Sequence, residues 1–328
     1  MNLINKKYFF SLQNEFYDSY IGEYFKVIKY KNIEYIYYNS RGDIKVYDNK
    51  TKQRKVVLKN VINSGFTIIN KNNILYLFAG CQITLKFILQ FKNSKKMVEY
   101  LDSLKKYTEP IENHIYNHNE LVLKDDYSPK IPINGIYIFS SNDGFKWSKL
   151  TSKPIMTRFN ETPNIKLGQI NFDTMPGLIK FKDSYLYFGR LNTSRQKREI
   201  YVRISSDLFT WNAPIKLNIL NPFNNHYMKS YYFLVPFIYK NELYGICNYF
   251  ETIDGEKYQF KNCCHIILKS KNIENWVIIK KIMEQNDSLC PYKDRITNVL
   301  VNKNIITIYV RENLKLPHQK FYKFNLKL

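Results

Sequence analysis

The three tryptophans of this chain recur in one short pattern, and their regular spacing limits the folds that the sequence can adopt. Each tryptophan ends a copy of S-x-(D/N)-x-x-x-W, at residues 141–147, 205–211 and 270–276. The tryptophans follow one another at intervals of 64 and 65 residues. Self-similarity at a fixed period indicates a chain that is built from repeated structural units.

The residues around each tryptophan predict the shape of one unit. In the middle copy, a hairpin with a polar turn covers residues 177–188 and an apolar strand covers residues 199–204. The Asp or Asn of the pattern can accept bonds from backbone N–H groups two residues on, which fixes a tight turn. The unit is therefore predicted to be a four-stranded antiparallel meander, which is the blade of a β-propeller. The pattern residues are expected to have structural roles in holding blades together.

Two degenerate copies extend the repeat at both ends, over about residues 25–58 and 295–328. The second unit begins near Gly65 and reaches Trp147 only after an insertion at roughly residues 92–132, which has helical spacing over 94–107. We predict that residues 1–328 form a single five-bladed β-propeller, all-β apart from this partly helical insertion. The N-terminal segment is expected to supply a strand that closes the ring. Composition agrees, because 28 Tyr and 22 Phe favour strands.

The charge, the cysteines and the termini set the expected surroundings of the protein. The formal net charge of +22 attracts polyanions, but the lysines are spread along the chain, so any DNA binding should be weak and without sequence specificity. The five cysteines form no C-x-x-C pair, and we expect free, mostly buried thiols. The N-terminus has no apolar region typical of a signal peptide, and no segment is long and apolar enough to span a membrane. We therefore expect a cytoplasmic protein.

No known cofactor motif is present in the sequence. It contains no dinucleotide-binding glycine motif, no P-loop and no nucleophile elbow. His114 and His118 have i, i+4 spacing but lack a helical pattern and a third ligand. We expect no cofactor and no metal, and the sequence gives no indication of the oligomeric state.

Two stretches resemble bacterial glycoside-hydrolase-like propellers, which are related to the β-fructosidase and the arabinanase/xylosidase families. The first is Asn171-Phe-Asp173-Thr-Met-Pro-Gly-Leu178, with an Asp before an inner strand. The second runs from Tyr201-Val-Arg203-Ile to Trp211, with an R-x-I strand followed by the S-x-D-x-x-x-W pattern. The resemblance implies a site at one end of the central channel, where paired carboxylates hydrolyse a glycosidic bond.

The resemblance also suggests which residues form that site. Asp173 is the best match to a family carboxylate, Asp18 is its counterpart in the first unit, and Glu251 is the candidate acid of the fourth unit. We expect Asp173 to point into the channel together with at least one of the other two. The matching region of the second unit, 62–65, contains no acid, so the family's catalytic trio is not reproduced. Candidate binding groups for a carboxylate or phosphate on a sugar are Arg190, Arg203 and Arg295.

Three functional hypotheses remain open at this point. The first is a glycoside hydrolase, or a related enzyme, that acts on an oligosaccharide or polysaccharide, which can be anionic. The second is a non-catalytic propeller that binds a glycan in polysaccharide assembly, which a channel lined by Tyr and Arg would favour. The third is a basic scaffold that binds protein or a polyanion, which a lysine-rich face remote from the channel would favour.

Overall fold

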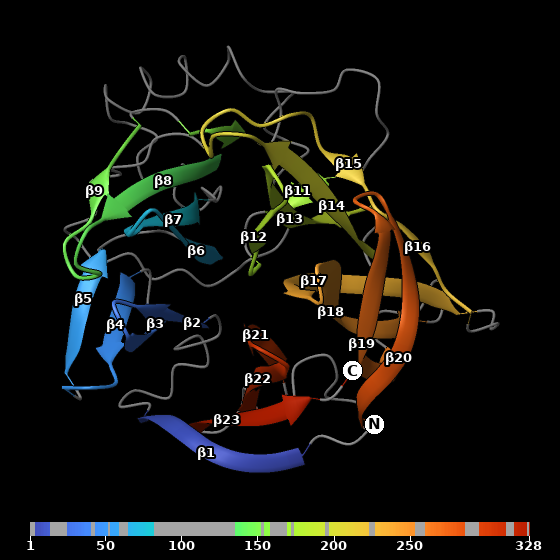
Figure 1. The fold of residues 1–328 in the computed structure, drawn as a ribbon. Helices are drawn as coiled ribbons and strands as arrows, with labels where there is room; N and C mark the ends of the chain where they lie inside the picture. Colours follow the sequence, from blue (N-terminus) through green and yellow to red (C-terminus); the bar gives the residue numbers. More distant parts are fainter. Residues whose placement is uncertain are drawn as a thin grey trace, which may run out of the picture.

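The computed structural model describes residues 4–13, 25–40, 43–51, 53–58, 65–81, 135–151, 154–157, 169–171, 174–193, 197–222, 227–252, 260–285, 295–312, 318–326 and 328. All the regular structure in these ranges is β-strand, and it forms five sheets. The sheets are arranged as blades around a central axis (Figure 1). The prediction of an all-β, five-bladed propeller is therefore confirmed. The inserted segment that was predicted to be partly helical lies outside the described residues.

The strands of the first three blades follow one another in sequence order from the axis outwards. The first blade consists of β2 (Phe25–Tyr30), β3 (Ile33–Ser40), β4 (Asp43–Asp48) and β5 (Arg54–Leu58). The second consists of β6 (Phe66–Lys71), β7 (Ile74–Cys81), β8 (Gly135–Ser141), β9 (Ser148–Lys149) and β10 (Met156–Thr157). The third consists of β12 (Gly177–Phe181), β13 (Ser184–Asn192), β14 (Arg198–Ser205) and β15 (Ile215–Lys216), with β11 (Gln169–Asn171) paired to β13.

The fourth blade has the longest strands and one exception to the antiparallel order. Its strands are β17 (Met228–Tyr239), β18 (Glu242–Thr252), β19 (Phe260–Asn272) and β20 (Asn275–Gln285). The short strand β16 (Asn218–Leu220), which comes from the connection between the third and fourth blades, pairs with β20 in parallel. The four-stranded antiparallel unit is thus the common framework, with short strands added at the outer edges.

The ring is closed by strands from both ends of the chain. The fifth blade consists of β21 (Arg295–Asn302), β22 (Ile305–Glu312), β23 (His318–Leu326) and, outermost, β1 (Ile4–Gln13). Strand β1 pairs antiparallel with β23, with Tyr8 opposite Tyr322. The expected closing strand is confirmed, and it joins the two ends of the chain through backbone hydrogen bonds.

The three tryptophans occupy equivalent positions in successive blades, as predicted. Each indole N–H donates to the backbone carbonyl three residues earlier, at 3.2, 2.9 and 2.9 Å for Trp147, Trp211 and Trp276. Each indole also meets, edge to face, an aromatic ring on the second strand of the preceding blade. The ring centroids are 5.9, 6.0 and 5.8 Å apart for Trp147–Tyr37, Trp211–Phe78 and Trp276–Phe188. The repeat therefore fastens each blade to the one before it.

The Asp or Asn of the pattern forms the turn that precedes each tryptophan. One carboxylate oxygen of Asp207 accepts bonds from the backbone N–H groups of Phe209 and Thr210, at 2.7 and 2.8 Å. These backbone bonds lower the pKa of Asp207 to about 2, against a weaker opposing effect of burial. Asp143 makes the same two bonds in the second blade. These two carboxylates therefore have structural roles in the turns, as predicted.

Apolar packing lies between neighbouring blades rather than in one central mass. The contact between the first and fifth blades, for example, joins Phe25 to Phe321 at 4.6 Å between ring centroids.

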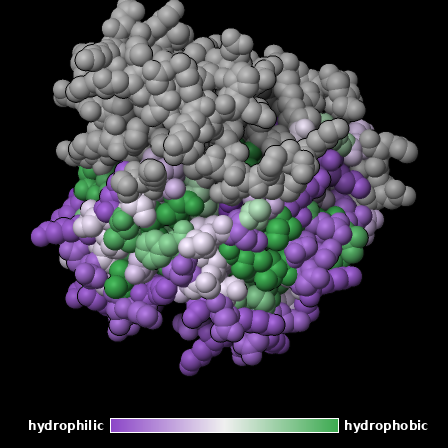
Figure 2. Space-filling model, turned by 90° about the horizontal axis from the view of Figure 1, so that it is seen from above, coloured by the Kyte–Doolittle hydropathy of each residue, from purple (hydrophilic) through white to green (hydrophobic). Residues whose placement is uncertain are grey.

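Seen from the side of the ring, hydrophilic residues gather along the lower edge of the molecule, with apolar patches above them (Figure 2). The described residues include no helix that could span a membrane.

The cysteines depart in part from the expectation of free thiols. Cys247 and Cys264 are free and buried, and burial raises the pKa of the Cys247 thiol. Cys263 is disulfide-bonded, so the expectation is wrong for this residue. Spacing alone does not indicate the bond, because a disulfide depends on how close two cysteines lie in the folded chain.

Candidate functional site

The innermost strands β2, β6, β12, β17 and β21 all begin at the same end of the ring, since the chain passes through every blade in the same direction. The second strand of each blade runs antiparallel to the first and so ends there. At this end, called the site end below, Arg190 and Glu251 lie near the ends of β13 and β18, and Arg295 begins β21. Residues far apart in sequence are thereby gathered around the mouth of one channel.

Tyr232 joins two of the predicted arginines. The guanidinium carbon of Arg190 lies 4.6 Å from the centroid of the Tyr232 ring, and that of Arg295 lies 5.4 Å from it. Both arginines are buried, at 3% and 1% exposure, whereas Tyr232 is half-buried. Cations over an aromatic face are held by the ring quadrupole. The third, fourth and fifth blades therefore contribute to one cluster of two positive charges around one ring.

Strand β17 is irregular at Tyr232. The pairing of β17 with β18 shifts register between Tyr231 and Leu234. A bulge of this kind turns a side chain away from the strict alternation of a strand. Tyr231 packs against Tyr249 within the blade, with 5.6 Å between ring centroids, while Tyr232 contacts the arginines of the neighbouring blades.

Glu251 is a fully buried carboxylate at the site end, with 0% exposure. Tyr249 donates its hydroxyl to one carboxylate oxygen, and Asn262 Nδ2 donates to the other at 2.5 Å. Asn221 Nδ2 in turn contacts the hydroxyl groups of Tyr249 and Tyr231, at 3.4 and 3.3 Å. Burial, followed by the bond to Glu251, raises the pKa of Tyr249, so its hydroxyl stays protonated as a donor. The carboxylate is held in one orientation from both sides.

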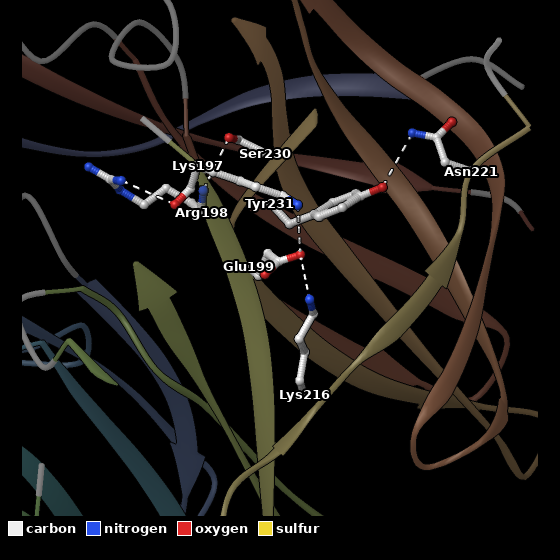
Figure 3. A network of polar contacts seen from close by, with 7 residues as sticks. All are labelled: Lys197, Arg198, Glu199, Lys216, Asn221, Ser230 and Tyr231. Carbon is white, nitrogen blue, oxygen red and sulfur yellow. Dashed lines mark hydrogen bonds and ion pairs between the residues drawn. The ribbon is translucent and has the colours of Figure 1, made fainter. Parts of the chain in front are cut away.

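Glu199 is a second buried glutamate nearby, but its surroundings are different. Its carboxylate contacts Lys216 Nζ at 2.9 Å and Lys197 Nζ at 3.3 Å (Figure 3). Burial alone would raise the pKa of Glu199, but the two lysines outweigh it and hold the pKa below its ordinary value. A glutamate paired in this way stays ionised and is poorly suited to donate a proton.

The backbone next to Glu199 is tied to the fourth blade. Arg198 N donates to Ser230 Oγ at 3.2 Å, and the Arg198 guanidinium donates to the Lys197 carbonyl at 3.2 Å (Figure 3). Ser230 is fully buried at the start of β17, two residues before Tyr232. The bond to Ser230 joins β14 to β17 close to the Arg190–Tyr232 contact.

His265 binds the backbone next to Arg295. Its Nε2 accepts a hydrogen bond from Ile296 N at 3.2 Å, next to Arg295. Burial, and then the charge of Arg295, lower the pKa of His265 to about 3. The imidazole is therefore neutral at physiological pH, which lets Nε2 accept this bond.

Lys26 adds a third basic group to this end of the channel. It is the second residue of β2, only 6% exposed, and burial lowers its pKa to about 7. Its ammonium is thus divided between charged and neutral forms near neutral pH. Sequence reasoning missed Lys26, because one lysine among so many carries no signal of burial.

The structure brings together some of the predicted residues and not others. Arg190 and Arg295 meet on Tyr232, and Glu251 lies at the same end. Arg203 lies towards the other end of β14, where it donates to the Asn212 carbonyl at 3.1 Å and lies over the Tyr201 ring at 5.9 Å. Burial lowers the pKa of Arg203 to about 10. Asp18 and Asp173 lie outside the described residues.

Packing explains the glycine at the start of the second blade. A Cβ atom at Gly65 would lie 1.6 Å from the carbonyl oxygen of Thr174, so no side chain fits at this position. Thr174 is buried just before β12 and directly follows Asp173 in the sequence. The chain leading to β12 therefore passes against the beginning of β6 at the site end.

Comparison with solved structures finds this architecture among glycoside hydrolases. The GH32 β-fructofuranosidase of Bombyx mori superposes with a TM-score of 0.54 and 12% identity, over 91% of this chain and 58% of that enzyme. The endo-arabinase of Bacteroides thetaiotaomicron gives 0.51 and 13%, over 93% of each chain. The β-xylosidase RS223 gives 0.54 and 10%, over 97% of this chain and 95% of that one.

This chain has the fold of those five-bladed glycoside hydrolase propellers. It spans little more than half the length of the silkworm enzyme. No protein-family model matches the sequence, and no curated protein matches it. Within the described ranges, no three His, Cys, Asp or Glu side chains gather in a way that could hold a metal ion.

Proposed function

We propose that this protein processes a glycan at the site end of the channel, as a hydrolase of glycosidic bonds. The observation that carries the proposal is Glu251, a fully buried carboxylate whose two oxygens are held by Tyr249 and Asn262. An oriented carboxyl group at the mouth of a channel is what general acid catalysis at a glycosidic oxygen requires. The fold shared with glycoside hydrolases supports the same reading by analogy.

Hydrolysis needs a second carboxylate, either as nucleophile or as the base that activates water. We propose Asp173 for this role, with Asp18 as the alternative. Asp173 directly precedes Thr174, whose carbonyl lies against Gly65 at the site end. Glu199 is unsuitable as the proton donor, because Lys197 and Lys216 keep it ionised.

The cluster around Tyr232 favours an acidic glycan as the ligand. Arg190 and Arg295 place two permanent positive charges beside one aromatic ring. Guanidinium groups recognise carboxylate and phosphate groups through paired hydrogen bonds, and an aromatic face packs against the apolar face of a sugar. We therefore propose that the arginines bind an anionic substituent of the glycan while the Tyr232 ring lies against the sugar.

A non-catalytic glycan-binding propeller is the second candidate. The same Arg190–Tyr232–Arg295 cluster favours it, because a ring with two cations is a binding element that needs no catalytic partner. This alternative predicts binding of the same acidic glycans without release of products.

A panel of glycans separates these candidates. Purified protein is incubated with fructosides, arabinan and xylo-oligosaccharides, each in a neutral form and in a form that carries uronic acid groups. New reducing ends are quantified, and binding is measured in parallel by calorimetry. Hydrolysis of acidic members supports the first candidate, and binding of acidic members without hydrolysis supports the second. Failure to bind any acidic member, or equal binding of neutral and acidic members, would contradict the proposed role of the arginines.

A further inference from the structure

The opposite end of the propeller carries a ring of tight turns with a shared sequence feature. Each blade joins its first and second strands by a two-residue turn at that end, after β2, β6, β12, β17 and β21. Neighbouring turns are in contact, because the Tyr30 hydroxyl donates to the carbonyl of Asn73 in the next blade at 2.8 Å. The first residue of the turn is a lysine in four of the five blades. These turn lysines are Lys31, Lys182, Lys240 and Lys303.

The four turn lysines adopt a backbone conformation that does not suit lysine. Their φ angles are +47°, +54°, +49° and +54°, which is the left-handed region. Glycine and asparagine are the residues that adopt this region at low cost in two-residue hairpin turns. The remaining turn has asparagine at the same place, Asn72, with φ +53°. The recurrence of lysine where asparagine would fit better indicates that its charge is used there.

Positive charge is concentrated and exposed on this turn face. All four turn lysines are exposed, as are Lys29 and Lys180, which lie two residues before them. The acidic residues in the same turns are Asp183 and Glu242, and Glu242 is already paired with Lys269 at 2.7 Å. The adjacent turns add the acids Asp143, Asp207 and Glu274 and the exposed lysines Lys146 and Lys271, so positive charge remains in excess on this face. Ile305, next to the last turn, is 54% exposed, the largest exposure among the described large apolar side chains.

The aromatic rings of this face argue against single-stranded nucleic acid as the partner. Lys31 lies over Tyr30 at 5.1 Å, Lys182 over Phe181 at 5.5 Å and Lys240 over Tyr239 at 5.3 Å from the ring centroids. Binding of single strands depends on open aromatic faces on which bases stack, and here the lysines occupy those faces. Turns of equal length on a closed ring instead present their charges around one face, which suits an extended anionic surface.

We propose that the turn lysines dock this face on an anionic membrane surface, which leaves the site end directed away from the membrane. Lysines close to an anionic leaflet contribute about fivefold each to membrane affinity. Four of them together correspond to a factor on the order of several hundred. The exposed Ile305 beside Lys303 can enter the headgroup region, as apolar side chains of peripheral proteins do.

The test replaces all four turn lysines by asparagine. Asparagine adopts a positive φ more readily than lysine, so the variant should fold at least as well as the wild type. A matched control replaces four lysines in the middle of other strands by glutamine, with the same loss of charge. These control residues are Lys45, Lys280, Lys281 and Lys323. Binding is measured by co-sedimentation with vesicles of phosphatidylcholine containing about a third phosphatidylserine, at about 0.1 M salt, where charges beyond about 10 Å are screened.

The wild type is expected to bind these vesicles and not vesicles of pure phosphatidylcholine. The turn variant should bind on the order of a hundredfold more weakly, and the control variant within about tenfold of the wild type. The proposal is overturned if the wild type fails to bind the anionic vesicles, or if the two variants bind them equally. It is also overturned if the turn variant loses affinity for duplex DNA as strongly as for vesicles, since the face would then be a general polyanion site.

Discussion

The Arg190 guanidinium lies 4.6 Å from the centre of the Tyr232 ring, and this contact joins the third blade to the fourth at the mouth of the channel. The contact lies beside a bulge in β17, where the pairing with β18 shifts register after Tyr231. Arg295 approaches the same ring from the fifth blade. The site thus depends on the closed ring as well as on its individual strands.

Removal of the Tyr232 ring should weaken glycan binding more than it weakens folding. Tyr232→Ala is expected to lower the affinity for an acidic glycan at least about tenfold, because it removes the aromatic ring that both guanidinium groups contact. Tyr232→Phe keeps the ring and should bind within about threefold of the wild type. Calorimetry measures both variants, with Tyr76→Ala as a half-buried control near the turn face. Equal losses in Tyr232→Ala and Tyr76→Ala would show that Tyr232 has no special role.

The tryptophans should make unequal contributions to stability although their positions are equivalent. Trp276 is fully buried, whereas Trp147 and Trp211 are half-buried. Trp276→Ala should lower the free energy of unfolding by about 3–5 kcal/mol, and the same change at Trp147 or Trp211 should cost less. Denaturant titration of the three variants checks this order. A loss below about 1 kcal/mol for Trp276→Ala would contradict the packing described for the third and fourth blades.

Protonation of His265 should lower the free energy of unfolding in mild acid. Its pKa is near 3 in the folded state, below the ordinary value of 6.5, so the unfolded chain binds the extra proton between these pH values. Stability from this group is present above pH 6.5 and is lost as the pH falls towards 3. His265→Gln keeps an acceptor for Ile296 N but does not titrate.

The measurement for His265 is the difference in free energy of unfolding between wild type and His265→Gln at two pH values. Comparison of the two proteins cancels the carboxylates that also titrate, such as Glu199. The advantage of the wild type should shrink by about 2–3 kcal/mol between pH 7 and pH 4.5. A difference that does not change with pH would mean that His265 is protonated without cost, contrary to its burial and to the nearby charge of Arg295.

The fold was predictable because its signal is periodic. Trp147, Trp211 and Trp276 repeat with their strands and turns, so the number of blades followed from the spacing and the chain length. The closing strand β1 could be expected on the same grounds, although its pairing with β23 could not be assigned. The insertion that interrupts the second blade does not disturb this inference, because the period resumes after it.

The composition of the site could be predicted only in part, because sequence patterns do not show which side chains of neighbouring blades meet. Arg190 and Arg203 both lie in strands of the third blade, but Arg190 contacts Tyr232 of the fourth blade, whereas Arg203 contacts Tyr201 and Asn212 of its own blade. Tyr232 was one tyrosine among 28, and only the bulge distinguishes it. Glu199 and Lys26 were missed for a similar reason, since burial of a charged residue depends on neighbouring blades.

The most direct test compares two buried glutamates in one assay of glycan hydrolysis. Glu251→Gln is nearly isosteric and keeps Tyr249 and Asn262 as neighbours, while Glu199→Gln serves as the matched control. With the acidic glycan that the wild type hydrolyses, Glu251→Gln should lower kcat at least about a hundredfold and leave binding nearly unchanged. Glu199→Gln should keep kcat within about threefold. Full activity in Glu251→Gln, or an equal loss in both variants, would contradict a catalytic role for Glu251.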